Sequence, residues 1–156
     1  MSLEEHDGHK ELDIYQQLVR AYVLLDDSDS RFFSDYGLSP RQFWTLSHLD
    51  EKEGHSMIDL SRLILTDKSN MTGIIDRLEK MKLVKRQPMV QDRRVTLITL
   101  TPKGKKLRDE IEQQHRLRIR ELIGVLPPER QGFFLECLET IAQHVEEYLA
   151  NTPAKT

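Results

Sequence analysis

Three consecutive charged residues, Asp92-Arg93-Arg94, precede the β-branched segment 95–100 in the stretch QDRRVTLITLTPKG. An arginine guanidinium presents forked N–H donors that match phosphate and carboxylate groups, so two adjacent arginines suit a polyanionic partner. Asp92 stands two positions from Arg94 and therefore shares its face of an extended segment. Its carboxylate could orient the Arg94 guanidinium, or form an ion pair with an arginine elsewhere, such as Arg77. Capping of the turn is the alternative role for Asp92. This segment therefore offers recognition chemistry.

The basic residues are concentrated in one part of the chain. Residues 60–108 contain 13 Lys/Arg and 4 Asp/Glu, a net charge of +9, whereas the rest of the chain carries −12 and the whole chain −3. A solvated charged face is the ordinary explanation of such a cluster. Because the basic block fills a continuous third of the chain and acidic segments flank it, a polyanion-binding surface is favoured, with nucleic acid as the leading candidate.

Other chemistries find little support. The chain has no nucleophile motif, Gly-rich phosphate loop or separate acid–base pair, so neither an enzyme nor a cofactor is predicted. His6 and His9 have a spacing compatible with metal binding, but a loose tail is preferred and no metal site is predicted. The single Cys137 cannot form an internal disulfide, which fits a reducing cytoplasm, and it is expected to be a buried, inert thiol.

The chain also lacks the signals of membrane insertion and secretion. No window approaches the roughly 18 apolar residues of a membrane span. The first residues do not combine a basic start with an apolar run, so no secretory signal is expected. A cytoplasmic protein without a membrane partner is predicted.

Hydrophobic spacing and capping residues predict the order of elements. Ser39-Pro40 with Gln42 forms a capping box, Ser56 with Asp59 a weaker one, and Thr66 or Asp67 can cap the next helix. Two short helices joined by about three residues constitute a helix-turn-helix, and a hairpin directly after them makes a winged helix. The predicted fold is mainly α with a small β-hairpin wing. Helices are expected over about 11–26, 39–52, 56–64, 68–81, 101–124 and 128–149, and strands over about 83–87 and 95–100.

One pattern resembles the wing signature of the MarR family of bacterial transcription regulators, Asp-x-Arg-x-x-x-(Val/Ile)-x-Leu-Thr. It is present as Asp92, Arg94, Ile98, Leu100 and Thr101, with DKSNMTGIIDRLEKMKLVKR upstream and LTPKG overlapping its end. The resemblance covers the order of elements over nearly the whole chain. It implies a homodimer with a helical dimerisation region at 10–36 and 102–150 and a winged helix-turn-helix DNA-binding region at 37–101. Such a dimer binds double-stranded DNA at a pseudo-palindromic operator, is expected to repress, and loses DNA affinity when an effector or stress signal acts.

The resemblance also implies which residues contact DNA. The polar side of helix 68–81 would enter the major groove, where Asn70 suits adenine, and Arg94 would probe the minor groove. A plain solvated helix face is the alternative, and Asp76 is expected to pair with Lys80. Lys85, Arg86, Lys103, Lys105 and Lys106 are expected to attract phosphates without reading the base sequence. The predicted DNA-binding residues are Lys68, Ser69, Asn70, Thr72, Arg77, Lys85, Arg86, Asp92, Arg93 and Arg94.

Two residues depart from the family pattern. Gly73 occupies the middle of the predicted recognition helix, where a larger residue is frequent. It allows either close approach of the backbone to DNA or close packing on the preceding helix. Lys82 replaces a frequent helix-ending glycine, so a strained or differently shaped turn is expected.

The resemblance also implies a site for a small effector, but it does not say which residues form it. MarR-like proteins often bind a small aromatic or anionic ligand between the dimer helices and the DNA-binding lobe, and packing in the core is the alternative use of the aromatic residues. A winged-helix module that binds proteins and has lost sequence-specific DNA binding remains the alternative function. The candidate ligand-binding residues are Tyr15, Tyr22, Phe33, Tyr36, Phe43, Trp44 and His48.

Overall fold

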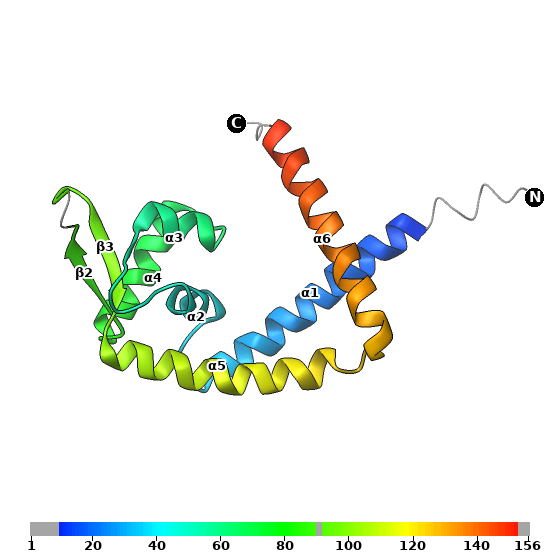
Figure 1. Cartoon of the computed structure of the whole chain (residues 1–156), viewed down its shortest axis with the longest axis horizontal. Helices are drawn as coiled ribbons and strands as arrows, with labels where there is room; N and C mark the ends of the chain where they lie inside the picture. Colours follow the sequence, from blue (N-terminus) through cyan, green and yellow to red (C-terminus); the bar gives the residue numbers. More distant parts are fainter. Residues whose placement is uncertain (1–9, 90–91, 153–156) are drawn as a thin grey trace, which may run out of the picture. The chain divides into compact units, whose positions relative to one another are not determined.

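A computed structural model of the chain describes residues 10–89 and 92–152 (Figure 1). The elements are α1 (Lys10–Ser34), α2 (Pro40–Ser47), β1 (His55–Ser56), α3 (Met57–Leu63), α4 (Lys68–Lys80), β2 (Val84–Pro88), β3 (Thr96–Leu100), α5 (Pro102–Ile123) and α6 (Pro128–Asn151). This mainly helical fold with a small antiparallel sheet confirms the predicted fold class. His6 and His9 lie outside the described residues.

The chain divides into two compact units. The first ends at Ile111 and holds α1 to α4, the sheet and the start of α5. The second begins at Glu112 and holds the end of α5 together with α6.

Capping residues start the short helices of the first unit. The Ser39 side chain accepts from Gln42 N–H and the Gln42 side chain accepts from Ser39 N–H at 2.8 Å, so the predicted capping box is present. Ser56 caps α3, and Asp67, one of the two candidates, caps α4 by accepting from Asn70 N–H at 2.8 Å. These side chains satisfy backbone donors that have no partner within their helix.

Two boundaries differ from the sequence prediction. α1 continues through the polar segment to Ser34, and α2 ends at Ser47 rather than near Lys52. Asp50 explains the early end, since its Oδ1 accepts from the N–H groups of Lys52 and Glu53 at 2.6 Å each. Such local hydrogen bonds compete with helix formation. They also hold the pKa of Asp50 below its ordinary value.

The sheet contains a strand that the sequence does not reveal. β1 has two residues and pairs antiparallel with β3, whose other edge carries β2, so the order is β1-β3-β2. A two-residue strand has no detectable alternation, and the pairing depends on a long-range contact between His55 and Ile98. This third strand covers the inner edge of the wing.

A single hydrophobic cluster holds the first unit together. It joins Phe33 of α1 to α2, α3, α4, the sheet and Ile111 of α5. Phe33 and Phe43 stack with ring centroids 4.5 Å apart. Burial of such aromatic side chains contributes most per residue to a core of this size.

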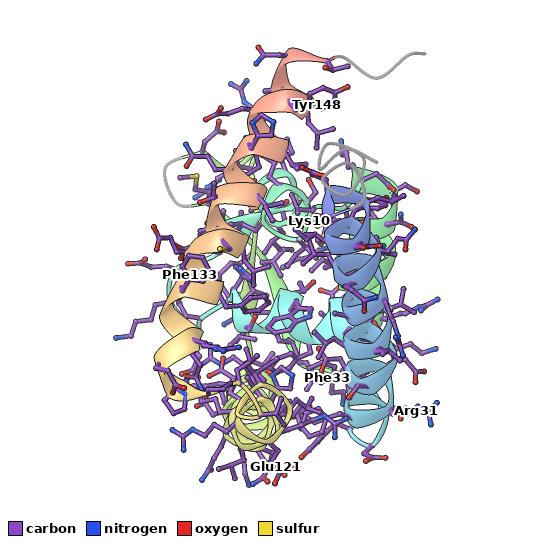
Figure 2. All side chains as sticks on the ribbon, turned by 90° about the vertical axis from the view of Figure 1, so that its right-hand side faces the viewer. Lys10, Arg31, Phe33, Glu121, Phe133 and Tyr148 are labelled. Carbon is purple, nitrogen blue, oxygen red and sulfur yellow. The ribbon has the colours of Figure 1, made fainter. Side chains whose placement is uncertain are left out.

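The helix α6 presents large apolar side chains to solvent. Phe133 and Tyr148, labelled in Figure 2, are 71% and 61% exposed, and no residue of α6 is buried. Cys137 is half-buried in this helix, so the expected burial of its thiol is only partial. No helix in the part of the chain that the structure describes is long and apolar enough to cross a membrane.

Candidate nucleic-acid interface

The helix α4 separates an apolar face from a polar one. Met71, Ile75 and Leu78 are completely buried against the rest of the first unit. The opposite side is exposed and carries Ser69, Thr72, Gly73, Asp76 and Arg77 at three- and four-residue intervals. This spacing places all five on one stripe of the helix surface, which suits insertion into a groove.

The first turn of α4 orders two of the predicted contact residues. The Asn70 amide nitrogen donates to the carboxylate of Asp67, and the Thr72 hydroxyl donates to the Lys68 carbonyl at 2.9 Å. The hydrogen bond from Asn70 N–H lowers the pKa of Asp67, so this carboxylate stays ionised. Asn70 therefore keeps its carbonyl oxygen and one N–H for a partner, and its orientation is set in advance. Lys68 and Ser69 are exposed.

Gly73 leaves an open notch on the polar stripe. A Cβ atom built at this position would have nothing within 4 Å. Close packing against α3 is therefore not the reason for the glycine, and that sequence-based alternative is wrong. The other sequence-based explanation, close approach of DNA to the backbone of α4, remains a prediction.

The turns that bound α4 contain residues in the left-handed region. Lys82 has φ +61°, and its N–H donates to Glu79 O at 2.8 Å while Leu83 N–H donates to Leu78 O at 2.9 Å. This is the Schellman arrangement, in which glycine is the usual residue, so Lys82 adopts the strained turn expected from the sequence. Leu65 ends α3 in the same manner, with φ +52°, and is 91% exposed.

The tip of the wing carries the arginines. Asp92 Oδ1 accepts from Arg94 N–H at 3.0 Å and lies 3.9 Å from Arg94 Nε. Asp92 thus caps the turn, as the alternative interpretation expected, and also lies near the Arg94 guanidinium. Within residues 10–89 and 92–152 it forms no ion pair with Arg77. The Arg94 side chain is 95% exposed, and Arg93 is exposed beside it.

Three basic residues that were expected to meet phosphates are engaged with the protein itself. Arg86 of β2 pairs with Asp76 at 2.6 Å and with Glu79, so the expected partner of Asp76, Lys80, is replaced. Lys103 Nζ donates to Met81 O at the end of α4. Lys105 pairs with Glu51 at 2.9 Å, and this ion pair raises the pKa of Lys105. Lys85 and Lys106 are exposed.

A separate cavity of about 500 Å³ lies within the first unit between α1, α2 and the end of α3. Tyr22, Trp44 and His48, three of the predicted ligand-binding residues, line it together with Arg41 and Leu65. The remaining wall comes from Leu25, Asp26, Asp29, Pro40, Leu63 and Ile64.

The other four aromatic candidates do not line this cavity. Phe33 and Phe43 are 0% and 1% exposed and belong to the core, which is the alternative use that the sequence left open for these aromatic residues. Tyr36 packs against the core and Phe32, and Tyr15 is 65% exposed on α1. Aromatic type alone does not distinguish core from cavity wall, because only the fold decides which side of a helix each ring occupies.

Proteins of similar sequence and fold are known. MhqR of Bacillus subtilis, an HTH-type transcriptional regulator, is 30% identical over 139 residues, which cover 89% of this chain and 96% of that protein. The structure of AbsC, a MarR family regulator from Streptomyces coelicolor, has a TM-score of 0.79 and 26% identity, covering 88% and 95% of the two chains. The structure of CouR from Rhodococcus jostii RHA1, solved with p-coumaroyl-CoA, has a TM-score of 0.73 and 26% identity. The match covers 83% of this chain and 92% of CouR.

The protein is therefore a transcription regulator built on a winged helix-turn-helix. Its relatives are regulators and not enzymes. The sequence profile of the MarR family matches residues 38–96, which run from Leu38 to Thr96, the first residue of β3. The chain belongs to the MarR family.

Proposed function

We propose that this regulator binds a pseudo-palindromic operator as a homodimer and acts as a repressor. The helix α4 enters the major groove through Lys68, Ser69, Asn70, Thr72 and Arg77, and the wing tip reaches the adjacent minor groove. The observation that carries this proposal is the Arg94 guanidinium, 95% exposed on a capped turn beyond the polar stripe of α4. A narrow minor groove concentrates negative potential and attracts such a group.

The assignment of regions is part of the proposal. Residues 37–101 contact DNA, and residues 10–36 and 102–150 form the dimer. Support comes from apolar side chains that each unit leaves exposed, since patches of this kind mark interaction surfaces. In α1 these are Leu12, Ile14, Tyr15, Val19, Tyr22 and Val23, and in α6 they are Phe133, Phe134, Leu135, Val145, Tyr148 and Leu149.

A twofold dimer would set the spacing of the operator. Two α4 helices related by such an axis read half-sites about one turn of DNA, roughly 34 Å, apart. The notch at Gly73 lets the helix backbone approach the groove floor, while Ser69 and Asn70 reach base edges or phosphates on either side.

A salt titration separates this function from a protein-interaction module. We expect binding to the DNA upstream of the coding region to weaken with salt, with a slope of log K against log salt of about −0.9 for each neutralised phosphate. Fluorescence anisotropy of labelled duplexes between low and physiological salt measures the slope. Weak binding to every duplex, without dependence on salt, would favour the interaction module.

The cavity beside α3 is proposed as the effector site. Trp44 and Tyr22 offer aromatic walls, and Arg41 offers donors to an anionic group, which suits a small aromatic acid. The p-coumaroyl-CoA in CouR shows an aromatic acyl ligand in a relative and supports this chemistry. Leu63 to Leu65 form one wall and directly precede the Asp67 cap of α4. A ligand there would shift the start of the recognition helix and lower DNA affinity.

The single tryptophan makes this testable. Trp44 is the only tryptophan in the chain and lines the cavity, so its fluorescence reports ligand binding directly. In titrations with phenolic acids we expect a saturable change for one compound, which should also lower operator affinity by about 5- to 150-fold. Tyr22→Ala should weaken the response, and Tyr15→Ala, outside the cavity, serves as its matched control. A panel that changes neither fluorescence nor DNA binding would contradict an aromatic effector.

A further inference from the structure

Arg86 connects the wing to the recognition helix. Its guanidinium donates through Nη2 to Asp76 at 2.6 Å and through Nη1 to Glu79. Asp76 and Glu79 stand three residues apart on α4, so both carboxylates lie within reach of one planar fork. The Arg86 side chain is only 31% exposed, although it comes from a strand of the wing.

The alternation along β2 explains why Arg86 and not Lys85 takes this place. Arg86 is two residues after Val84, which is 2% exposed, and it pairs with Ile98, which is completely buried. Directly opposed residues of antiparallel strands share a face, so Arg86 extends from the side of the sheet that packs on the helices. Lys85 extends from the other side of the sheet, although both residues are exposed.

We propose that Arg86, Asp76 and Glu79 form a clamp that sets the position of the wing relative to α4, and that Arg86 is a positioning residue rather than a DNA contact. This inference rests on the proposed DNA-binding function. Along Arg86 to Pro88, β2 pairs only with β3, whereas β3 is also supported on its other edge by β1 at Leu97 and Ile98. The clamp joins β2 to α4 at Arg86. It therefore fixes where Arg94, at the tip of the wing, lies relative to Asn70 of α4.

The charges explain the choice of partners. Asp76 belongs to the exposed polar stripe, where an isolated carboxylate would repel phosphates. Arg86 compensates part of this charge, and its carboxylate partners, Asp76 first, raise its pKa, so it stays protonated. Ion pairs on a surface are individually weak, but two carboxylates on one arginine restrict its geometry more than a single pair.

The free protein provides the first test. Arg86→Gln is compared with Lys85→Gln, which removes the same charge at the neighbouring position on the opposite face. By amide hydrogen exchange we expect several-fold faster exchange at Gln87 and Leu97, which pair across β2 and β3, in Arg86→Gln only. Equal protection in both variants, with unchanged melting temperatures, would overturn the clamp. This test needs no DNA, so it stands even if the operator proposal fails.

The second test uses the sign of the effect on DNA binding. The double variant Asp76→Asn with Glu79→Gln removes two negative charges from α4, so simple electrostatics predicts tighter binding. The clamp predicts weaker operator binding, by about fivefold. Arg86→Gln should weaken binding without changing the salt slope, whereas Lys85→Gln should reduce the slope by about 1 if Lys85 contacts a phosphate. Tighter binding by the double variant, or a slope lowered by about 1 in Arg86→Gln, would show that Arg86 serves DNA directly.

Discussion

Replacing Gly104 with alanine is expected to destabilise the winged lobe severely. A Cβ atom at this position would lie 1.9 Å from the carbonyl oxygen of Leu83 and 2.8 Å from its carbonyl carbon. These are backbone atoms, and Leu83 O also accepts from Thr101 N–H at 3.0 Å, so the obstacle cannot rotate away. We expect the free energy of unfolding to fall by about 3 kcal/mol or more. Thermal unfolding measured by circular dichroism should show a melting temperature lowered by roughly 10 °C.

Gly73→Ala is the matched control, because it adds the same methyl group to a glycine with open space around it. In a helix interior this change should raise the unfolding free energy by about 1 kcal/mol. The two variants should therefore shift stability in opposite directions. A Gly104→Ala protein as stable as the parent would mean that α5 does not contact Leu83, the residue before β2, as the structure has it. Weaker operator binding by the stabilised Gly73→Ala protein would support close approach of the α4 backbone to DNA.

Arg94→Ala is expected to have the largest effect on DNA binding. The side chain is 95% exposed and its removal exposes no core, so stability should change by less than about 0.5 kcal/mol. Operator affinity should fall by about 1–3 kcal/mol, which is roughly ten- to a hundredfold, because an inserted guanidinium is lost from the minor groove. Anisotropy titrations with the operator and with a variant that carries G·C pairs at its flanks measure this effect.

The neighbouring arginine provides the comparison. Arg93→Ala removes the same charge one position away and should weaken binding to all duplexes by a similar factor. Its loss of operator affinity should be smaller than that of Arg94→Ala. Arg94→Lys keeps the charge and should recover only part of the affinity, since an ammonium lacks the planar fork. If Arg94→Ala binds the operator as the parent does, the wing does not have the proposed role.

Local signals predicted most of the architecture of this protein. The capping box at Ser39 and Gln42, the cap before α4, and the alternation of segment 95–100 depend on residues near each other in the chain, so the sequence shows them directly. The strand β1 was missed because its two residues are ordered by pairing with β3, about forty positions later.

The roles of individual basic residues were predicted less well. In the sequence, Lys85 and Arg86 are equivalent members of a basic block, and so are Lys105 and Lys106. The structure separates them, because Arg86 meets two carboxylates of α4 and Lys105 meets Glu51 across a long-range contact. Charge counts describe attraction at a distance but not which cations already have partners.

By itself, the sequence determined the family, the order of the elements and the position of the wing tip, since periodicity, caps and the Asp92-to-Thr101 motif are local patterns. The tertiary structure decided which aromatic rings form the core and which line the cavity, why Gly104 must lack a side chain, and that Arg86 joins the wing to α4. Each of these depends on contacts between different helices and strands. Packing and desolvation act through space, so no local pattern of residue types can specify them.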